Sequence, residues 1–129
     1  MPLDSKIFIV IGCILLSIAN GLAAFGFHVS PDVLPPEELQ NWFWAVDMQY
    51  YFGGGLIVLG LLIKVVGVSW FFRIAGVLMV LGLMIFAGLL YIQALTDFVS
   101  PENTIPTGGQ MLIFSWLFVA IGVIRTKAA

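Results

Sequence analysis

The chain has 129 residues and a net charge of −2, and 61% of its residues are hydrophobic while only 9% carry a charge. A soluble domain is typically about 45–50% apolar and about 25% charged, so this composition excludes a water-soluble protein and indicates one embedded in lipid. The single cysteine, Cys13, excludes an intramolecular disulfide, and five basic against seven acidic residues give no sign of a nucleic-acid partner.

Four apolar segments are each long enough to cross a bilayer as a helix, within a single domain of residues 1–129. The first holds 21 uncharged residues, which at about 1.5 Å per residue cover about 30 Å, the thickness of the hydrocarbon layer. In the fourth, Pro106 and Gly108 predict that the regular helix begins nearer Gln110. The sequence thus predicts an all-α integral membrane four-helix bundle with short loops, whose spans are at about residues 7–27, 42–63, 74–95 and 105–124.

The loop before the second span carries the signals of a helix start. Residues 35–38 read Pro-Pro-Glu-Glu, and proline followed by acidic residues is typical of a first helical turn. We therefore predict a short outer interfacial helix that runs through the Trp-Phe-Trp cluster of residues 42–44, at headgroup depth, into the second span. A similar turn is expected at Ser30-Pro31-Asp32, and Val-Ser-Pro-Asp of residues 29–32 is echoed at 99–102, which leaves a duplicated hairpin open.

The charges at the ends of the spans predict how the chain is oriented. All five basic residues fall on one face, and that face is retained in the cytoplasm of bacteria or in the mitochondrial matrix. We therefore expect a multi-pass protein of the bacterial or mitochondrial inner membrane with both termini inside. The basic residues are Lys6, Lys64, Arg73, Arg125 and Lys127, and the acidic residues of the other face are Asp32, Glu37, Glu38, Asp47, Asp97 and Glu102.

Small residues recur along the spans at helical spacing. Lipid provides no hydrophobic drive between helices, so close packing depends on residues that let the backbones approach. These positions are predicted to pack helices, and the sequence leaves open whether the faces meet within one chain or between chains. The candidate packing residues are Ser17, Gly21, Gly53, Gly60, Gly76 and Gly88.

Polar residues gather near the acidic ends of the spans, where they suit two interpretations. One is an interfacial hydrogen-bond network, which is inexpensive at that depth. The other is a functional site for a proton, a metal or a polar substrate, with His28, Asp47 and Asp97 at similar depth. The candidate cluster consists of Asn20, His28, Asp47, Gln49, Tyr50, Tyr51, Tyr91, Gln93 and Asp97.

Known catalytic and cofactor patterns are absent from the sequence. A single histidine excludes a haem held by two histidines of one chain, and no pair of metal ligands occurs at helical spacing. Cys13 has no base nearby in the sequence, and no phosphate-binding glycine loop is present. We therefore expect no enzyme activity, no metal and no cofactor.

Several short motifs resemble the YgdD-like family, also known as domain of unknown function 423, of small four-span membrane proteins from bacteria and mitochondria. The resemblance extends over most of the chain and implies the same four-span fold, but it implies no activity. The similar segments are Ala24-Phe25-Gly26-Phe27-His28, Pro36-Glu37-Glu38-Leu39, Met48-Gln49-Tyr50-Tyr51, Phe86-Ala87-Gly88-Leu89-Leu90-Tyr91 and Ile105-Pro106-Thr107-Gly108-Gly109 with Trp116.

The chain departs from this family at two positions. Phe52 stands where the family usually has a second histidine, and Ser115 stands where a glycine often precedes the tryptophan. Any two-histidine site that the family uses is therefore missing here.

Two functions follow as hypotheses. The first is an accessory, structural or assembly subunit that packs against a larger membrane protein complex or self-associates in the lipid bilayer. The alternative is a small oligomeric transporter or channel-like module with a polar path at the acidic, outer face.

Overall fold

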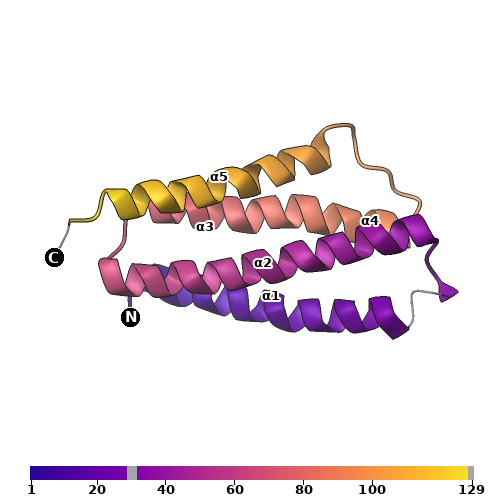
Figure 1. The fold of residues 1–129 in the computed structure, drawn as a ribbon, viewed down its shortest axis with the longest axis horizontal. Helices are drawn as coiled ribbons and strands as arrows, with labels where there is room; N and C mark the ends of the chain where they lie inside the picture. The colour runs from indigo at the N-terminus through magenta and orange to yellow at the C-terminus, as the bar shows by residue number, and fades with distance from the viewer. Residues whose placement is uncertain (29–31, 128–129) are drawn as a thin grey trace.

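Four long antiparallel helical spans form the protein (Figure 1). The computed structural model describes residues 1–28 and 32–127, which contain no strand. All four spans are long and apolar enough to cross a membrane, which confirms the predicted all-α fold. The elements are α1 (Leu3–His28), α2 (Pro36–Val66), α3 (Trp70–Leu83), the π-helical turn η2 (Met84–Gly88), α4 (Leu89–Leu95) and α5 (Thr104–Ile124), and α3, η2 and α4 together make the third span.

The starts of α2 and α5 can be compared with the helix starts predicted from the sequence. The short outer helix expected before the second span is the first part of α2, which runs unbroken from Pro36 into the span. The predicted start of the fourth helix near Gln110 is wrong, because α5 begins at Thr104. Pro106 falls in the first turn of α5, where amide groups have no partner within the helix, so its missing N–H costs nothing there. The turn expected at residues 30–32 and the first copy of the echo at 29–32 lie largely outside the described residues.

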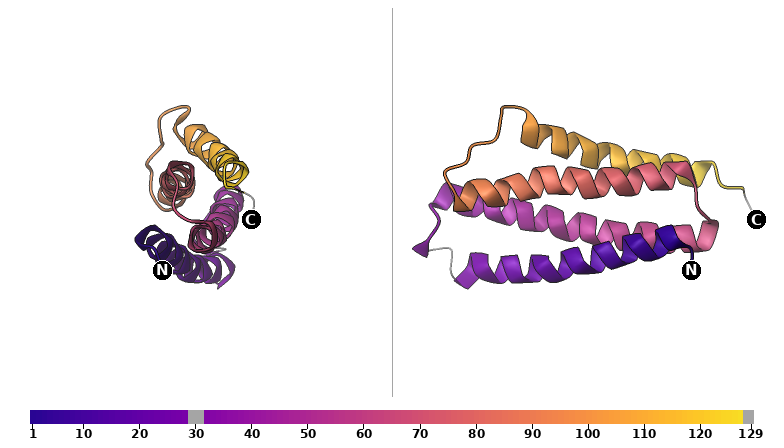
Figure 2. Two further views of the ribbon diagram at one scale, coloured as in Figure 1. Left: turned by 90° about the vertical axis from the view of Figure 1, so that its left-hand side faces the viewer. Right: turned by 180° about the vertical axis from the view of Figure 1, so that it is seen from behind.

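The helices pack as two antiparallel pairs. One pair is α1 with α2 and the other is α3 with α5, and α2 also packs along α3 and α4 (Figure 2). The start of α1, the end of α5 and the α2–α3 turn lie together, and we call this the basic end because all five Lys and Arg residues lie in or next to it (Figure 1). The opposite end, with Asp32, Glu37, Glu38, Asp97 and Glu102, is called the acidic end.

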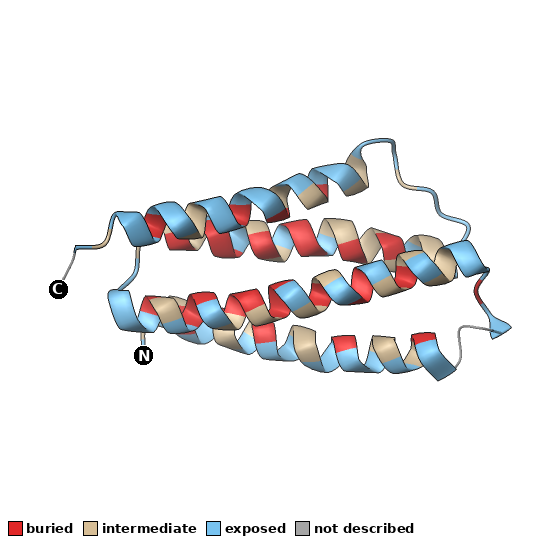
Figure 3. Ribbon diagram, in the orientation of Figure 1, coloured by how far each residue is buried: buried red, intermediate tan, exposed pale blue. Residues whose placement is uncertain are grey.

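The helix at the centre of the bundle is α2. Of its membrane-spanning window 44% is buried inside the bundle, against 17% for α1, so most of the α1 surface faces outward (Figure 3). Phe8 of α1 packs with Leu56, Phe72 and Met79 in one apolar core that spans α1, α2 and α3. At the basic end the Ser5 hydroxyl donates to the Gly60 carbonyl at 2.6 Å, and Arg73 pairs with Asp4 at 2.6 Å, which ties α1 to both neighbours.

The contact between α1 and α2 depends on glycine. A Cβ atom added at Gly12 would lie 2.5 Å from the Gly53 carbonyl oxygen, and one added at Gly60 would lie 2.8 Å from the Ser5 carbonyl oxygen. Since both neighbours are backbone atoms, neither clash is relieved by a side-chain rotation. The distance between the two helices is therefore set by residues without side chains.

This contact generates a prediction for two alanine variants of α1. Gly12→Ala should lower the free energy of unfolding in detergent micelles by about 1–3 kcal/mol, because the backbones must move apart. Gly21→Ala is the matched control, since a Cβ atom at Gly21 meets nothing within 4 Å. It should change the stability by less than about 0.5 kcal/mol. Equal losses in the two variants would show that the close approach at Gly12 does not hold the pair together.

Candidate functional site

Gln49 is a buried polar residue that connects three helices. Its side chain, on α2, is 4% exposed. The amide nitrogen Nε2 donates to the Leu15 carbonyl of α1 at 2.8 Å, and the amide oxygen Oε1 accepts from the Tyr91 hydroxyl of α4 at 2.8 Å. Because lipid offers no substitute partner, each of these bonds stabilises the contact between its two helices.

Trp42 extends this network toward the acidic end. The indole Nε1 donates to the Leu22 carbonyl at 2.9 Å. The ring packs edge-on against Tyr91, with 4.7 Å between centroids, and tilted against Phe25, with 5.1 Å between centroids. The sequence predicted Trp42 as an anchor at headgroup depth, but its side chain is buried among α1, α2 and α4. Its neighbour Trp44 is exposed on the outer surface of α2. The packed position of Trp42 follows from its place on the inner face of α2, which the aromatic cluster alone did not reveal.

Two further hydrogen-bonded pairs, Asn20 with Tyr50 and Gln93 with Ser100, are not connected to Gln49 by hydrogen bonds within the described part of the chain. Asn20 accepts from the Tyr50 hydroxyl at 2.7 Å and donates to the Leu16 carbonyl of its own helix at 3.0 Å. Gln93 accepts from the amide and the hydroxyl of Ser100 at 2.7 and 2.6 Å, which fastens the end of α4 to the following loop. Five of the candidate residues, namely Asn20, Gln49, Tyr50, Tyr91 and Gln93, therefore form hydrogen bonds, in three separate groups.

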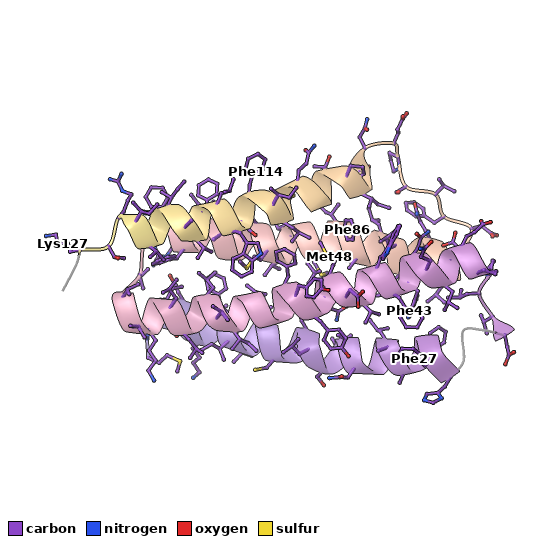
Figure 4. All side chains as sticks on the ribbon, viewed as in Figure 1. Phe27, Phe43, Met48, Phe86, Phe114 and Lys127 are labelled. Atoms are coloured by element: carbon purple, nitrogen blue, oxygen red, sulfur yellow. The ribbon has the colours of Figure 1, made fainter. Side chains whose placement is uncertain are left out.

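The charged candidates do not converge. His28, Asp47 and Asp97 are all exposed at the surface of the bundle, as is Tyr51. Within residues 1–28 and 32–127, no group of three or more histidine, cysteine or acidic side chains is placed to hold a metal ion. The aromatic rings of Phe27 and Phe43 pack together at 4.8 Å near the same end (Figure 4). Among the described residues, His28, Asp47 and Asp97 thus do not form a metal-binding group with one another.

Glu38 is a residue of this end that the sequence did not single out as a site. Its Oε2 atom is buried and has no hydrogen-bond partner among the residues that the structure describes. Together with Gln93, Thr96 and Asp97 it lines a hollow of about 380 Å³ between the start of α2 and the end of α4. Two acidic residues, Glu38 and Asp97, thus line one hollow at the acidic end.

The candidate packing residues divide into two classes. Gly53, Gly60 and Gly76 pack inside the chain, where an added Cβ atom would meet Leu16, Ile9 and the Phe8 ring respectively. The other class faces away from the bundle. Ser17 and Gly21 are exposed on α1, and an added Cβ atom at Gly21 or Gly88 meets nothing within 4 Å.

Comparison with known proteins identifies relatives of this chain. The model of the family described as "Protein of unknown function (DUF423)" matches residues 22–109. A UPF0382 membrane protein of Staphylococcus epidermidis is 34% identical over 122 residues, which cover 93% of this chain and 97% of the relative. The UPF0382 membrane protein YwdK of Bacillus subtilis is 32% identical over 120 residues, covering 93% and 98% of the two chains. No solved structure matches.

The bond between Gln49 and Tyr91 leads to a double-mutant prediction. Gln49→Met and Tyr91→Phe each remove one partner, and their interaction energy in a thermodynamic cycle should lie between about 0.6 and about 1.7 kcal/mol, the average and the maximum measured for hydrogen bonds between membrane helices. The measurement is the free energy of unfolding in micelles. Tyr51→Phe serves as the control, because Tyr51 is exposed and its loss of a hydroxyl should cost less than about 0.5 kcal/mol. Additive effects of Gln49→Met and Tyr91→Phe would contradict a coupled pair.

Proposed function

Because this chain belongs to the DUF423 family of small membrane proteins, we propose that it acts without catalysis of its own, as an accessory subunit packed against a larger membrane complex. The observation that carries this proposal is the unpartnered outer face of α1. Cys13, Ser17 and Gly21 lie four residues apart and are all exposed; Cys13 is about 100° around α1 from Gly12, and Ser17 and Gly21 lie progressively farther from the contact with α2.

The shape of this face suits a second helix. Small residues form a shallow line along α1, and the larger side chains Ile14 and Ile18 are exposed beside it. Small residues at a four-residue spacing allow the close backbone approach by which membrane helices associate. On the inner side of α1 a small residue already allows such a close approach, because Gly12 packs on Gly53 of α2.

The absence of catalysis is part of the proposal and is supported by where the reactive groups lie. Cys13 is exposed on the outward face of α1, away from the polar residues of the acidic end. A nucleophilic thiol needs a base within hydrogen-bonding reach, and the histidine of this chain, His28, lies at the far end of the same helix. At about 1.5 Å per residue the two are separated by about 20 Å along α1.

A second candidate function, a small oligomeric transporter, has one observation in its favour. The bonded polar pair of Gln49, which is buried, and Tyr91, which is partly buried, lies within the spans, and Tyr91 is on α4, the helix that follows the π-helical turn η2. Polar residues in spans and π-helical turns both occur at functional sites. A structural role also accounts for the pair, because its bond and the bond to Leu15 hold three helices together. The accessory subunit is therefore the stronger proposal.

The chain and its bacterial relatives are membrane proteins, and we propose that this one resides in the bacterial inner membrane with its basic end in the cytoplasm. The support is the separation of charge along the bundle. The five basic residues lie at one end, and of the acidic residues only Asp4 lies there, paired with Arg73. Retention of basic residues on the cytoplasmic side would place both termini inside.

The first prediction concerns association. After gentle detergent extraction from native membranes, native mass spectrometry should find the 14.1 kDa chain in a stoichiometric complex with larger subunits. Gly21→Leu should reduce the co-purified amount by about tenfold, because the added side chain fills the line of small residues. Ala120→Leu, a similar enlargement on the exposed surface of α5, is the control and should leave the complex intact.

Other outcomes would contradict the proposal. A lone monomer or a homo-oligomer in the native extract would exclude a larger complex. If a reconstituted homo-oligomer carried a solute flux that His28→Ala or Asp47→Ala abolished, the transporter would replace the accessory subunit. Loss of the complex in Ala120→Leu as well would show that α1 is not the docking face.

The second prediction concerns orientation. A fluorescent protein fused after the last residue should fluoresce, and alkaline phosphatase inserted after Glu102 should be active, because the first folds in the cytoplasm and the second outside it. The reverse fusions are the controls. Phosphatase at the terminus should be inactive, and the fluorescent protein after Glu102 should not fluoresce. If phosphatase inserted in the loop between Lys64 and Arg73 were active, the topology would be the reverse of the proposed one.

A further inference from the structure

A hollow of about 890 Å³ opens at the basic end of the bundle. It lies between the α2–α3 turn and the residues that follow α5, where Lys127 extends from the end of the described chain (Figure 4). Its volume falls within the range of about 300–1,000 Å³ that is typical of small-molecule sites. The lining residues that matter here are Val65, Val68, Trp70, Phe71, Arg125 and Lys127.

The charge of this hollow is positive. Arg125 and Lys127 are its only charged lining residues, and neither forms an ion pair with any residue that the structure describes. The guanidinium of Arg125 lies 5.5 Å from the centre of the Phe71 ring, a cation–π contact that holds it at the wall of the hollow. Arg73 differs, since its charge is matched by Asp4. Two cations are thus available for an anion at this site.

The start of α3 adds to the positive potential. Ser69 caps this helix by accepting from the amide of Phe72 at 3.3 Å, while Trp70 and Phe71 of the first turn line the hollow. The first amide groups of a helix have no partner within it and carry a partial positive charge. An anion in the hollow therefore meets two side-chain cations and the start of a helix.

Part of the remaining wall is apolar and exposed. Val65 and Trp70 are 80% and 72% exposed, and Val68 lies between them in the turn. In a chain that spans a bilayer, the ends of the helices lie at the level of the lipid head groups. A molecule that fits this hollow must therefore combine an anionic group with an apolar body and must be present at the membrane interface.

We propose that this hollow binds the head group of an anionic phospholipid from the surrounding bilayer, with the phosphate between Arg125 and Lys127. The glycerol and the first methylene groups of the acyl chains lie along Val65, Val68 and Trp70. Basic pockets between membrane helices bind acidic head groups in this way. The proposal is independent of the accessory-subunit function, since it concerns a lipid at the basic end and not the outer face of α1.

The test is lipid binding by the purified full chain in a neutral detergent, followed by native mass spectrometry. The chain should retain phosphatidylglycerol in preference to phosphatidylcholine. In the double variant Arg125→Gln with Lys127→Gln, the apparent affinity for phosphatidylglycerol should fall about thirtyfold, since each basic residue near an acidic lipid contributes about a factor of five. Arg125→Lys with Lys127→Arg keeps both charges and should retain the lipid, which shows that the altered chain ends still fold.

A matched control distinguishes a site from a diffuse attraction. Lys6→Gln with Lys64→Gln removes the same charge from the same end but from residues that do not line the hollow, and the affinity should fall by at most about threefold. Equal losses in the two double variants would overturn the proposal, as would equal retention of both lipids by the unaltered chain. Inorganic phosphate should not displace the lipid, and full displacement would identify a site for a free anion instead.

Discussion

The close approach of α1 and α2 is the contact on which the rest of the bundle depends. The hydrophobic effect does not drive helices together in lipid, so the helix bundle is stabilised by dispersion contacts and hydrogen bonds, which act at short range. Gly12 on α1 and Gly53 and Gly60 on α2 allow the two helices to come this close, because a side chain at Gly12 or Gly60 would collide with the backbone of the other helix. With the two backbones in contact, Gln49 and Trp42 of α2 reach carbonyl groups of α1 and hold them.

The second helix pair, α3 with α5, also packs through glycine, near the acidic end. A Cβ atom added at Gly108 of α5 would lie 2.8 Å from the Phe86 amide nitrogen and 2.9 Å from the Gly82 carbonyl oxygen. Both pairs therefore pack through backbone contacts, and α2 joins them through the apolar core and through the bond from Tyr91 to Gln49. The outer face of α1 is the contrast, since its small residues Ser17 and Gly21 are exposed and a Cβ atom added at Gly21 meets no described atom within 4 Å.

The sequence was sufficient to predict the spans and their charged ends, because hydropathy and charge depend on composition along the chain and not on contacts. It was not sufficient to separate Gly53, which packs inside, from Gly21, which faces out, because a glycine has the same identity on either side of a helix. Trp42 was placed at the interface for the same reason: its direction depends on the neighbours of α2. The start of α5 was set too late because the proline rule applies to helix interiors, and Pro106 is in a first turn.

The π-helical turn η2 sets the direction of the last part of the third span, and the sequence of Met84–Gly88 carries no signal for it. A π-helical turn accommodates about one extra residue, and one residue corresponds to a rotation of about 100° around a helix axis. Before the turn, Gly82 packs against α5, and within it Phe86 still contacts Gly108. After the turn, Tyr91 donates to Gln49 and packs on Trp42, both on α2. A regular helix of the same sequence would direct Tyr91 away from Gln49 by that rotation and leave the buried amide oxygen of Gln49 without a partner. The irregular turn is therefore the feature that connects the third span to the central helix at the acidic end.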